Sequence, residues 1–158
     1  MCLIVDANVA AMTFTPNPAP DFQPVWDALW KCRATAVFGG QLAQEYYELR
    51  RHRRIIREME RSGRLCRVAD AKVRDATNRL IRSEACVSDD EHIVALAKVS
   101  GVRLLCSHDR DLHTDFTNPR LLRPPGHVYQ NPAHAHLIRK FCDGSATSRR
   151  KARRSRKR

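Results

Sequence analysis

The stretch Cys2-Leu3-Ile4-Val5-Asp6 sets the fold class of the chain, because four consecutive apolar residues end at a carboxylate. An apolar run without polar alternation predicts a short strand that is buried on both faces, as in a parallel sheet. In such a sheet the functional site lies outside the carboxyl ends of the strands, which is where Asp6 falls. The opening stretch therefore predicts an α/β fold with Asp6 at its functional edge.

Apolar runs and helical patterns alternate along the rest of the chain. Besides the strand at 2–5, strands are predicted at residues 35–38, 65–68, 102–106 and 128–129. Helices are predicted at about 22–32, 41–61, 70–85, 89–100 and 132–141. The segments at 16–20 and after the fourth strand are predicted as loops. Strands that alternate with helices predict a parallel sheet covered on both faces.

Three further acidic residues are predicted to lie beside Asp6. Glu45 lies near the start of the long second helix, at the border of its apolar stripe. Asp90 opens the fourth predicted helix, and Asp109 follows the fourth predicted strand. Carboxylates gathered at one edge of a sheet repel one another, and they are tolerated mainly when a divalent cation neutralises them.

Each acid also has a purely structural explanation. Ser88 and Glu91 have the spacing of a capping box, which stabilises a helix start whatever the function. Helical periodicity does not separate Asp89 from Asp90. The two acids after the fourth strand are typical turn residues. Only the four carboxylates together, and none of them alone, indicate a site.

Three motifs resemble those of PIN-domain nucleases. Residues 3–9, Leu-Ile-Val-Asp-Ala-Asn-Val, resemble the opening strand of that family, which ends in Asp with a small polar residue two positions later. Residues 90–97, Asp-Glu-His-Ile-Val-Ala-Leu-Ala, resemble its Asp-x-x-Ile-x-Ala-x-Ala helix. Residues 102–112 resemble its strand ending in Thr/Ser-x-Asp. The resemblance covers roughly residues 1–140, and the motif spacing is most similar to the small VapC-type toxins.

The resemblance implies a PIN-like three-layer α/β/α sandwich with a central, mostly parallel sheet over residues 1–141. It carries catalysis and metal binding onto Asp6, Glu45, Asp90 and Asp109. Asp90 is selected over Asp89 because the Ile and Ala positions of the motif then align. Asn8 is a supporting polar residue, and Asp111 is the alternative fourth acid.

The activity implied by the resemblance is metal-dependent endoribonuclease action on RNA phosphodiester bonds, as in the toxin of a toxin–antitoxin pair. An all-oxygen site selects hard cations, so one or two Mg²⁺ or Mn²⁺ ions are expected. A softer metal is an alternative, because His92, His108 and His113 lie near the acids. A structure-specific DNA nuclease and a catalytically inactive nucleic-acid-binding protein are the alternative functions. Partners left open are an antitoxin protein and a second copy of the chain.

The charge distribution favours a polyanionic partner. The formal net charge is +12, and eight basic residues fall within 149–158. Residues 142–158 are therefore predicted to be a disordered basic tail that acts as an electrostatic arm. The candidate nucleic-acid contacts in it are Arg149, Arg150, Lys151, Arg153 and Arg154.

The helix predicted at 41–61 carries a second basic surface. Arginines recur on one stripe at Arg50, Arg54, Arg57 and Arg61. A solvated face is the plain explanation of this stripe, and a track for backbone phosphates is the functional one. The stripe is predicted to face roughly 140° away from Glu45, which argues against direct contact with the metal.

Six cysteines are spread along the chain without a CxxC pair. Three of them, Cys2, Cys66 and Cys106, lie in predicted strands, where a free thiol behaves as a small hydrophobe. A disulfide framework is therefore not expected, which favours a reducing, cytoplasmic location. No apolar stretch approaches the length needed to cross a membrane, so a protein without a membrane partner is expected.

Overall fold

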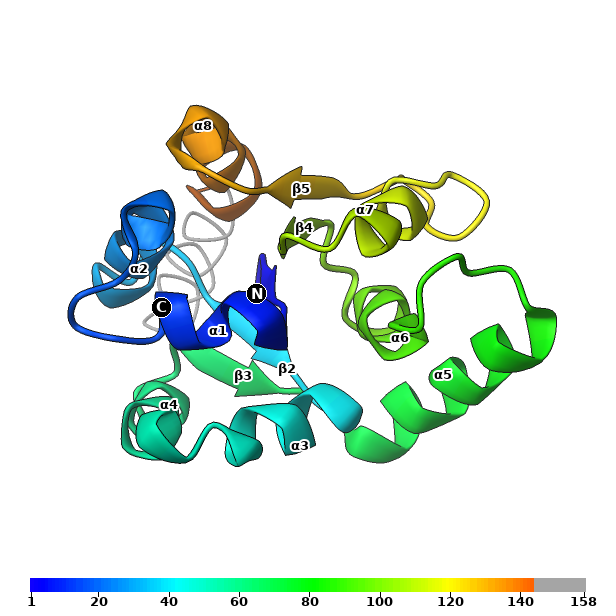
Figure 1. The fold of residues 1–158 in the computed structure, drawn as a ribbon, viewed down its shortest axis with the longest axis horizontal. Helices are drawn as coiled ribbons and strands as arrows, with labels where there is room; N and C mark the ends of the chain where they lie inside the picture. Colours follow the sequence, from blue (N-terminus) through cyan, green and yellow to red (C-terminus); the bar gives the residue numbers. More distant parts are fainter. Residues whose placement is uncertain (144–158) are drawn as a thin grey trace, which may run out of the picture.

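The computed structural model describes residues 1–143, so the predicted basic residues at 149–158 lie outside the described part of the chain. The fold is mixed α/β, with short parallel strands at its centre (Figure 1). The strands are β1 (Ile4–Val5), β2 (Ala36–Phe38), β3 (Leu65–Arg67), β4 (Leu104–Cys106) and β5 (His127–Tyr129). All five predicted strands are confirmed in position.

The strand order brings the ends of β1 and β4 together. β4 pairs in parallel with both β1 and β5, and β2 pairs in parallel with β3. A parallel bridge between Leu3 and Ala36 joins the two groups, so the order is β3-β2-β1-β4-β5. Because β1 and β4 are parallel neighbours, the residues that follow them lie at the same edge.

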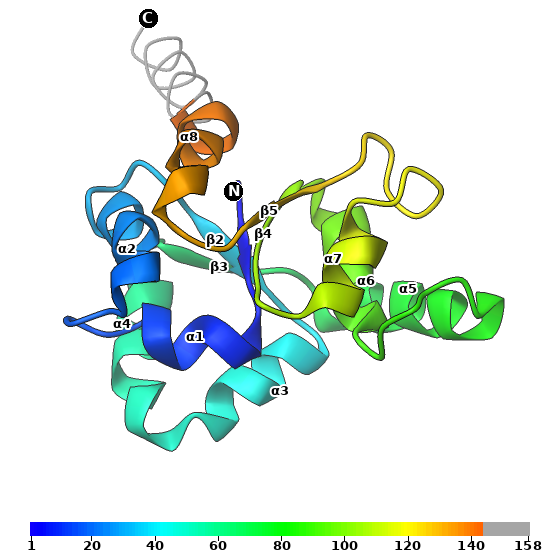
Figure 2. The same cartoon turned by 45° about the horizontal axis from the view of Figure 1, so that its top comes forward.

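Helices lie on both sides of these strands. They are α1 (Ala7–Thr13), α2 (Gln23–Trp30), α3 (Gln41–Glu48), α4 (Arg53–Arg61), α5 (Asp70–Ser83), α6 (Glu91–Ser100), α7 (Arg110–Phe116) and α8 (Ala135–Ile138). Short turns of 3-10 helix occupy Pro20–Phe22, Arg50–His52 and Pro132–His134, and a π-helical turn occupies Arg139–Asp143. Figures 1 and 2 show α5, α6 and α7 together on one side, with α1, α2 and α4 on the other. Within residues 1–143, no helix combines the length and the apolar character needed to cross a bilayer.

The helix prediction is wrong at three places. The predicted helix at 41–61 is interrupted at Leu49, where φ is −72° and ψ is 71°, so that α3 and α4 are separate helices. Two short helices form where no helix was predicted: α1, before the predicted loop at 16–20, and α7, in the predicted loop after the fourth strand. Each begins at an aspartate whose carboxylate accepts a backbone N–H in the first turn, Asp6 from Asn8 and Asp109 from Leu112. An aspartate at this position stabilises a helix start, even for a helix of seven residues.

The connection from β2 to α3 requires two glycines. A Cβ on Gly39 would lie 2.6 Å from the carbonyl oxygen of Val68. Gly40 has a φ of +58°, and a Cβ there would lie 2.9 Å from Cγ1 of Val73. The paired glycines therefore let Val68, after β3, and Val73, in the first turn of α5, pack directly against the backbone at the start of α3.

A disulfide joins Cys2, just before β1, to Cys142 in the last described turn. The interpretation of Cys2 as a free thiol is therefore wrong. The two residues are separated by 140 positions, and nothing in the cysteine spacing pairs them. Because the chain contains this bond, its cysteine pattern does not by itself define a reducing compartment.

Candidate functional site

A single hydroxyl connects the acids that follow β1 and β4. Ser107 comes directly after β4 and is buried. Its Oγ donates a hydrogen bond to Oδ2 of Asp6 at 2.7 Å and accepts one from the backbone N–H of Asp109 at 3.0 Å. Asp6 is itself only 5% exposed. The serine of the Ser-x-Asp motif therefore fixes the two predicted site residues side by side.

Glu45 reaches the site from α3 and is held by two side chains. Its Oε1 accepts a hydrogen bond from Nε2 of Gln41 at 3.0 Å, and its Oε2 lies 3.3 Å from Nε2 of His92. Burial raises the pKa of Glu45, but the bonds and charge from His92 together with the bond from Gln41 outweigh burial and lower it. His92 is only 2% exposed, so it is a buried partner of Glu45 rather than a surface histidine.

The next residue of α3 anchors that helix to the sheet. Tyr46 is fully buried, and its hydroxyl donates a hydrogen bond to the carbonyl of Val5, the residue before Asp6. Its ring packs against Phe14 and Phe38, with centroid distances of 5.4 and 5.8 Å. The packing of Tyr46 therefore fixes the position of α3, and with it that of Glu45, relative to Asp6.

Asp90 is the carboxyl most affected by the others. It caps α6 without a side-chain hydrogen bond to the helix. Burial and repulsion from Asp6, Asp109 and Glu45 outweigh the influence of His92 and raise the pKa of Asp90 to about 6. Burial also raises the pKa of Asp6, against the bonds that it accepts. The four predicted acids therefore share one electrostatic neighbourhood.

Asp90 is held in place by a buried acid that the sequence analysis did not predict. Asp115, on the inner face of α7, accepts hydrogen bonds from the backbone N–H groups of Val87 and Ser88, each at 2.8 Å. The hydroxyl of Ser88 also donates to Asp115 at 2.7 Å, so the predicted capping box does not form. Ser88 Oγ in turn accepts the N–H of Asp90 at 3.3 Å. The sequence signal that could have identified Asp115 is its position one turn after Leu112, on an otherwise apolar helix face.

The supporting and alternative residues lie outside this arrangement. Asp89 and Asp111 are exposed. Asn8 is exposed as well, and only its backbone N–H approaches Asp6, at 3.4 Å from Oδ1. Of the two candidates for the fourth acid, Asp109 is the one whose charge helps to raise the pKa of Asp90 and whose backbone N–H bonds to Oγ of Ser107.

The histidines do not form a site for a softer metal. His113 uses both ring nitrogens: Nε2 lies 2.7 Å from the carbonyl oxygen of Ser107, and Nδ1 lies 3.1 Å from Nε2 of Gln130. His92 faces Glu45, and His108 is exposed, with Nε2 3.3 Å from the carbonyl oxygen of Gln130. Because these three histidines have other partners, the ligands that the site offers to a metal are mainly carboxylate oxygen atoms.

The carboxylates suit a hard cation in chemistry but are not arranged as a finished coordination shell. Within residues 1–143, no three Asp, Glu, His or Cys side chains are close enough together to hold one ion. Asp109 is engaged in capping α7, and Glu45 is engaged with Gln41 and His92. Burial, and after it repulsion from the other acids, raises the pKa of Asp90, and a divalent cation would relieve that repulsion. Binding of an ion would therefore require these side chains to rotate toward it.

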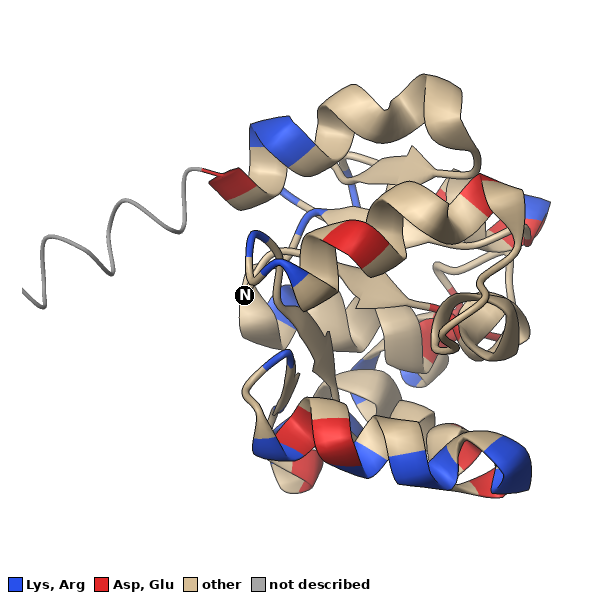
Figure 3. Cartoon of the chain, turned by 90° about the vertical axis from the view of Figure 1, so that its left-hand side faces the viewer, with Lys and Arg blue, Asp and Glu red and all other residues tan. Residues whose placement is uncertain are grey.

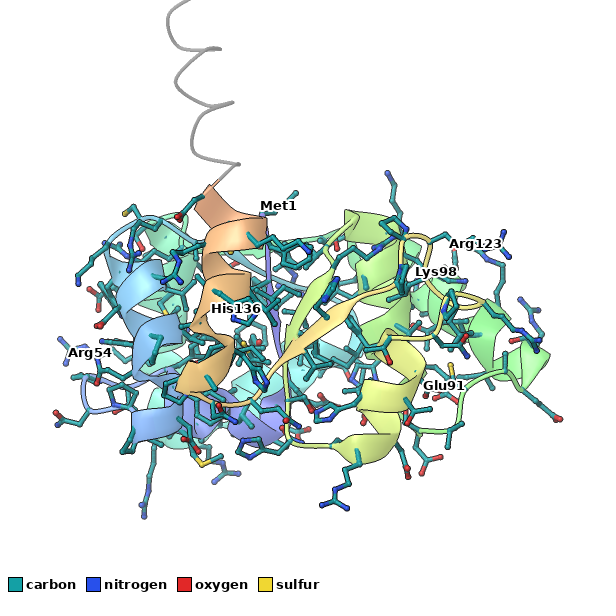
Figure 4. The ribbon with its side chains drawn as sticks, turned by 90° about the horizontal axis from the view of Figure 1, so that it is seen from above. Met1, Arg54, Glu91, Lys98, Arg123 and His136 are labelled. Atoms are coloured by element: carbon teal, nitrogen blue, oxygen red, sulfur yellow. A yellow bond between two sulfur atoms is a disulfide. The ribbon has the colours of Figure 1, made fainter. Side chains whose placement is uncertain are left out.

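The arginine surface is remote from the acids. Arg54, Arg57 and Arg61 are exposed on α4, whereas Arg50 precedes it, so the predicted continuous stripe and its 140° angle to Glu45 are wrong. Acidic residues interrupt the basic ones on this helix (Figure 3). Arg54 and Glu91, the first residue of α6, lie on opposite sides of the molecule in Figure 4.

Neutralising Asp90 should stabilise the protein above pH 6. Because its pKa is raised from 3.8 to about 6, ionised Asp90 destabilises the fold, and this penalty develops as the pH rises between those values. The full shift corresponds to about 3 kcal/mol, and solvent screening of the half-buried carboxyl reduces it to about 1–2 kcal/mol. We expect Asp90→Asn to gain that amount at pH 8 in EDTA, measured by urea unfolding, and little at pH 4.

The matched control is Asp89→Asn, which removes an exposed carboxylate one position earlier and should change stability by less than about 0.5 kcal/mol. If Asp90→Asn were less stable than the wild type at pH 8, its carboxylate would be a structural cap and not part of a crowded acidic site.

The fold and site define this chain as a mixed α/β protein with one buried and three partly buried acidic residues at the carboxyl edge of its parallel strands. No family model, no curated protein and no solved structure matches the chain.

Proposed function

We propose that the protein is a metal-dependent nuclease of the PIN-like class that hydrolyses phosphodiester bonds in RNA. The observation that carries the proposal is the gathering of the acids at one sheet edge. Oγ of Ser107 bonds to the Asp6 carboxylate and to the backbone N–H of Asp109, and burial together with repulsion from Asp6, Asp109 and Glu45 raises the pKa of Asp90. Such an arrangement costs stability, and it is typical of sites whose charge a cation offsets. The net charge of +12 supports a polyanionic substrate, because a basic chain attracts nucleic acid.

Asp6, Asp90 and Asp109, with Glu45, are the residues that would hold Mg²⁺ or Mn²⁺. When bound, the ion would activate water and offset the charge that develops on the phosphate oxygens. His92 holds the Glu45 carboxylate in place, and Ser107 orients that of Asp6. Because protons compete for Asp90, metal binding should weaken as the pH falls below about 6.

The test is cleavage by the purified protein, with Mg²⁺ or Mn²⁺, of total RNA, single-stranded DNA and duplex DNA. We expect RNA to be cut and EDTA to prevent it. In the absence of nucleic acid, Mn²⁺ should raise the melting temperature of the wild type and not that of Asp6→Asn. Cleavage of DNA alone would favour the DNA nuclease, and an absence of both cleavage and metal stabilisation would refute the proposal.

The similarity of motif spacing to VapC-type toxins supports a narrower role within this class, that of the toxin of a toxin–antitoxin pair. This role predicts a gene for a cognate antitoxin next to the gene for this protein. It also predicts growth arrest on expression, which Asp6→Asn should relieve.

A further inference from the structure

A polar groove lies between the start of α3 and one stripe of α5. Its volume is about 360 Å³, and its lining includes Gln41, Gln44, Arg74, Thr77, Asn78 and Ile81. A volume of this size suits a small ligand or one unit of a polymer. Figure 1 shows the start of α5 beside the start of α3, at the lower edge of the molecule.

The groove is connected to the acidic site by a single side chain. Gln41 lines the groove and also donates the hydrogen bond to Oε1 of Glu45, at 3.0 Å. Glu45 in turn faces His92 in α6. Gln41 therefore lies at the boundary between the groove and the acidic site.

Asp70 is the one acidic residue in the lining of the groove, and both of its carboxylate oxygens have partners. The N–H of Gly40 donates to Oδ1 of Asp70 at 2.9 Å, which joins the starts of the two helices. Oδ2 of Asp70 forms an ion pair with Arg67 at 2.7 Å. Because Arg67 compensates this carboxylate, Asp70 opposes the approach of a phosphate only weakly.

The side chains along the groove offer the groups that a nucleotide needs. Arg74 is exposed, and its guanidinium suits a phosphate. Gln44 and Asn78 have amides whose donors and acceptors match base edges. Within residues 1–143, none of these three side chains is occupied by a hydrogen bond. Ile81 is 51% exposed and adds an apolar surface to the lining of the groove.

We propose that this groove binds one nucleotide of a single-stranded RNA next to the scissile phosphate, with Arg74 on its phosphate and Gln44 and Asn78 on its base edge. The inference rests on the proposed nuclease function. A single strand is required because its base edges are not paired. No aromatic residue lines the groove, so hydrogen bonding rather than stacking would decide which base is preferred.

The first test measures binding without cleavage. In the full-length Asp6→Asn protein in EDTA, the anisotropy of labelled single-stranded RNAs reports affinity. Arg74→Ala should weaken binding about tenfold and lower the salt slope by about 0.7. Gln44→Ala and Asn78→Ala should weaken binding only to RNAs that carry one particular base, by about tenfold, with an unchanged salt slope.

The matched control is Arg79→Ala, which removes the same charge from an exposed position of α5 outside the groove. We expect it to keep the affinity within about twofold, since it leaves the proposed phosphate contact intact. Equal losses in Arg74→Ala and Arg79→Ala would overturn the proposal, because the effect would then be general electrostatics. All four substituted side chains are exposed, so their loss should leave the fold intact.

The second test separates the groove from the nuclease function. The sites at which the active protein cuts total RNA should change in sequence for Asn78→Ala and stay the same for Arg79→Ala. If RNA is cut at unchanged sites by Asn78→Ala and Gln44→Ala, the groove proposal is wrong and the nuclease proposal stands. If nothing is cut, but the groove variants alone lose RNA affinity, the nuclease proposal fails and the RNA-binding groove stands.

Discussion

Replacing Asp6 by Asn should reduce RNA cleavage by about a thousandfold or more, with the fold retained. An ion held by carboxylates lowers the barrier by several kcal/mol, and each 1.36 kcal/mol corresponds to about tenfold in rate. The asparagine keeps an oxygen that can accept the hydroxyl of Ser107, and it caps a helix as well as aspartate does. The rate is measured under single-turnover conditions with saturating Mn²⁺, and the fold is checked by circular dichroism.

Asp75→Asn is the matched control for Asp6→Asn, because it removes one negative charge from an exposed position on α5. It should leave the rate within about twofold, since Asp75 is not one of the four acids and salt screens exposed charges. Cleavage by Asp6→Asn at the wild-type rate would contradict the assignment of the site. Unfolding of the variant would instead show that the carboxylate is structural.

Ending the chain at Ser148 should weaken nucleic-acid binding for all sequences alike. The deletion removes eight basic residues and leaves the body with a formal charge of +4. Each phosphate contact that is lost on a single strand should flatten the dependence of log affinity on log salt by about 0.7. Cleavage at saturating substrate should survive, because the four acids lie within the residues that the truncated protein keeps. Affinities at several salt concentrations, with matched single-turnover rates, measure both effects.

A full-length variant with residues 149–158 in shuffled order is the matched control for this truncation. It keeps the charge and should bind as the wild type does, because a contribution that is purely electrostatic does not depend on sequence. Weak binding by the shuffled variant would show that the tail has a specific contact. Loss of turnover at saturating substrate in the truncated protein would show that the tail belongs to the active site.

The strands were predictable, and the short helices were not. The apolar runs of β1, β2 and β4 stand out because these parallel strands are buried on both faces, whereas β3 and β5, at the ends of the strand order, are only partly buried. The helices α1 and α7 have only seven residues each, which is too few turns for a periodic pattern to be recognised. The interruption at Leu49 was missed because α3 and α4 have compatible patterns on either side of it, and no Gly or Pro marks the break.

The sequence by itself determined that acids follow β1 and β4 and open α6, since their positions follow from local patterns and from the common edge of parallel strands. The tertiary structure decided which groups support them. Glu45 contacts His92, which is 47 positions away in the sequence. The hydrogen bond between Asp6 and Ser107 spans 101 positions, and that between Asp115 and Ser88 spans 27. The disulfide between Cys2 and Cys142 spans 140. Such partners are selected by the packing of distant elements, because a buried polar group bonds to whichever donor or acceptor the fold brings within reach.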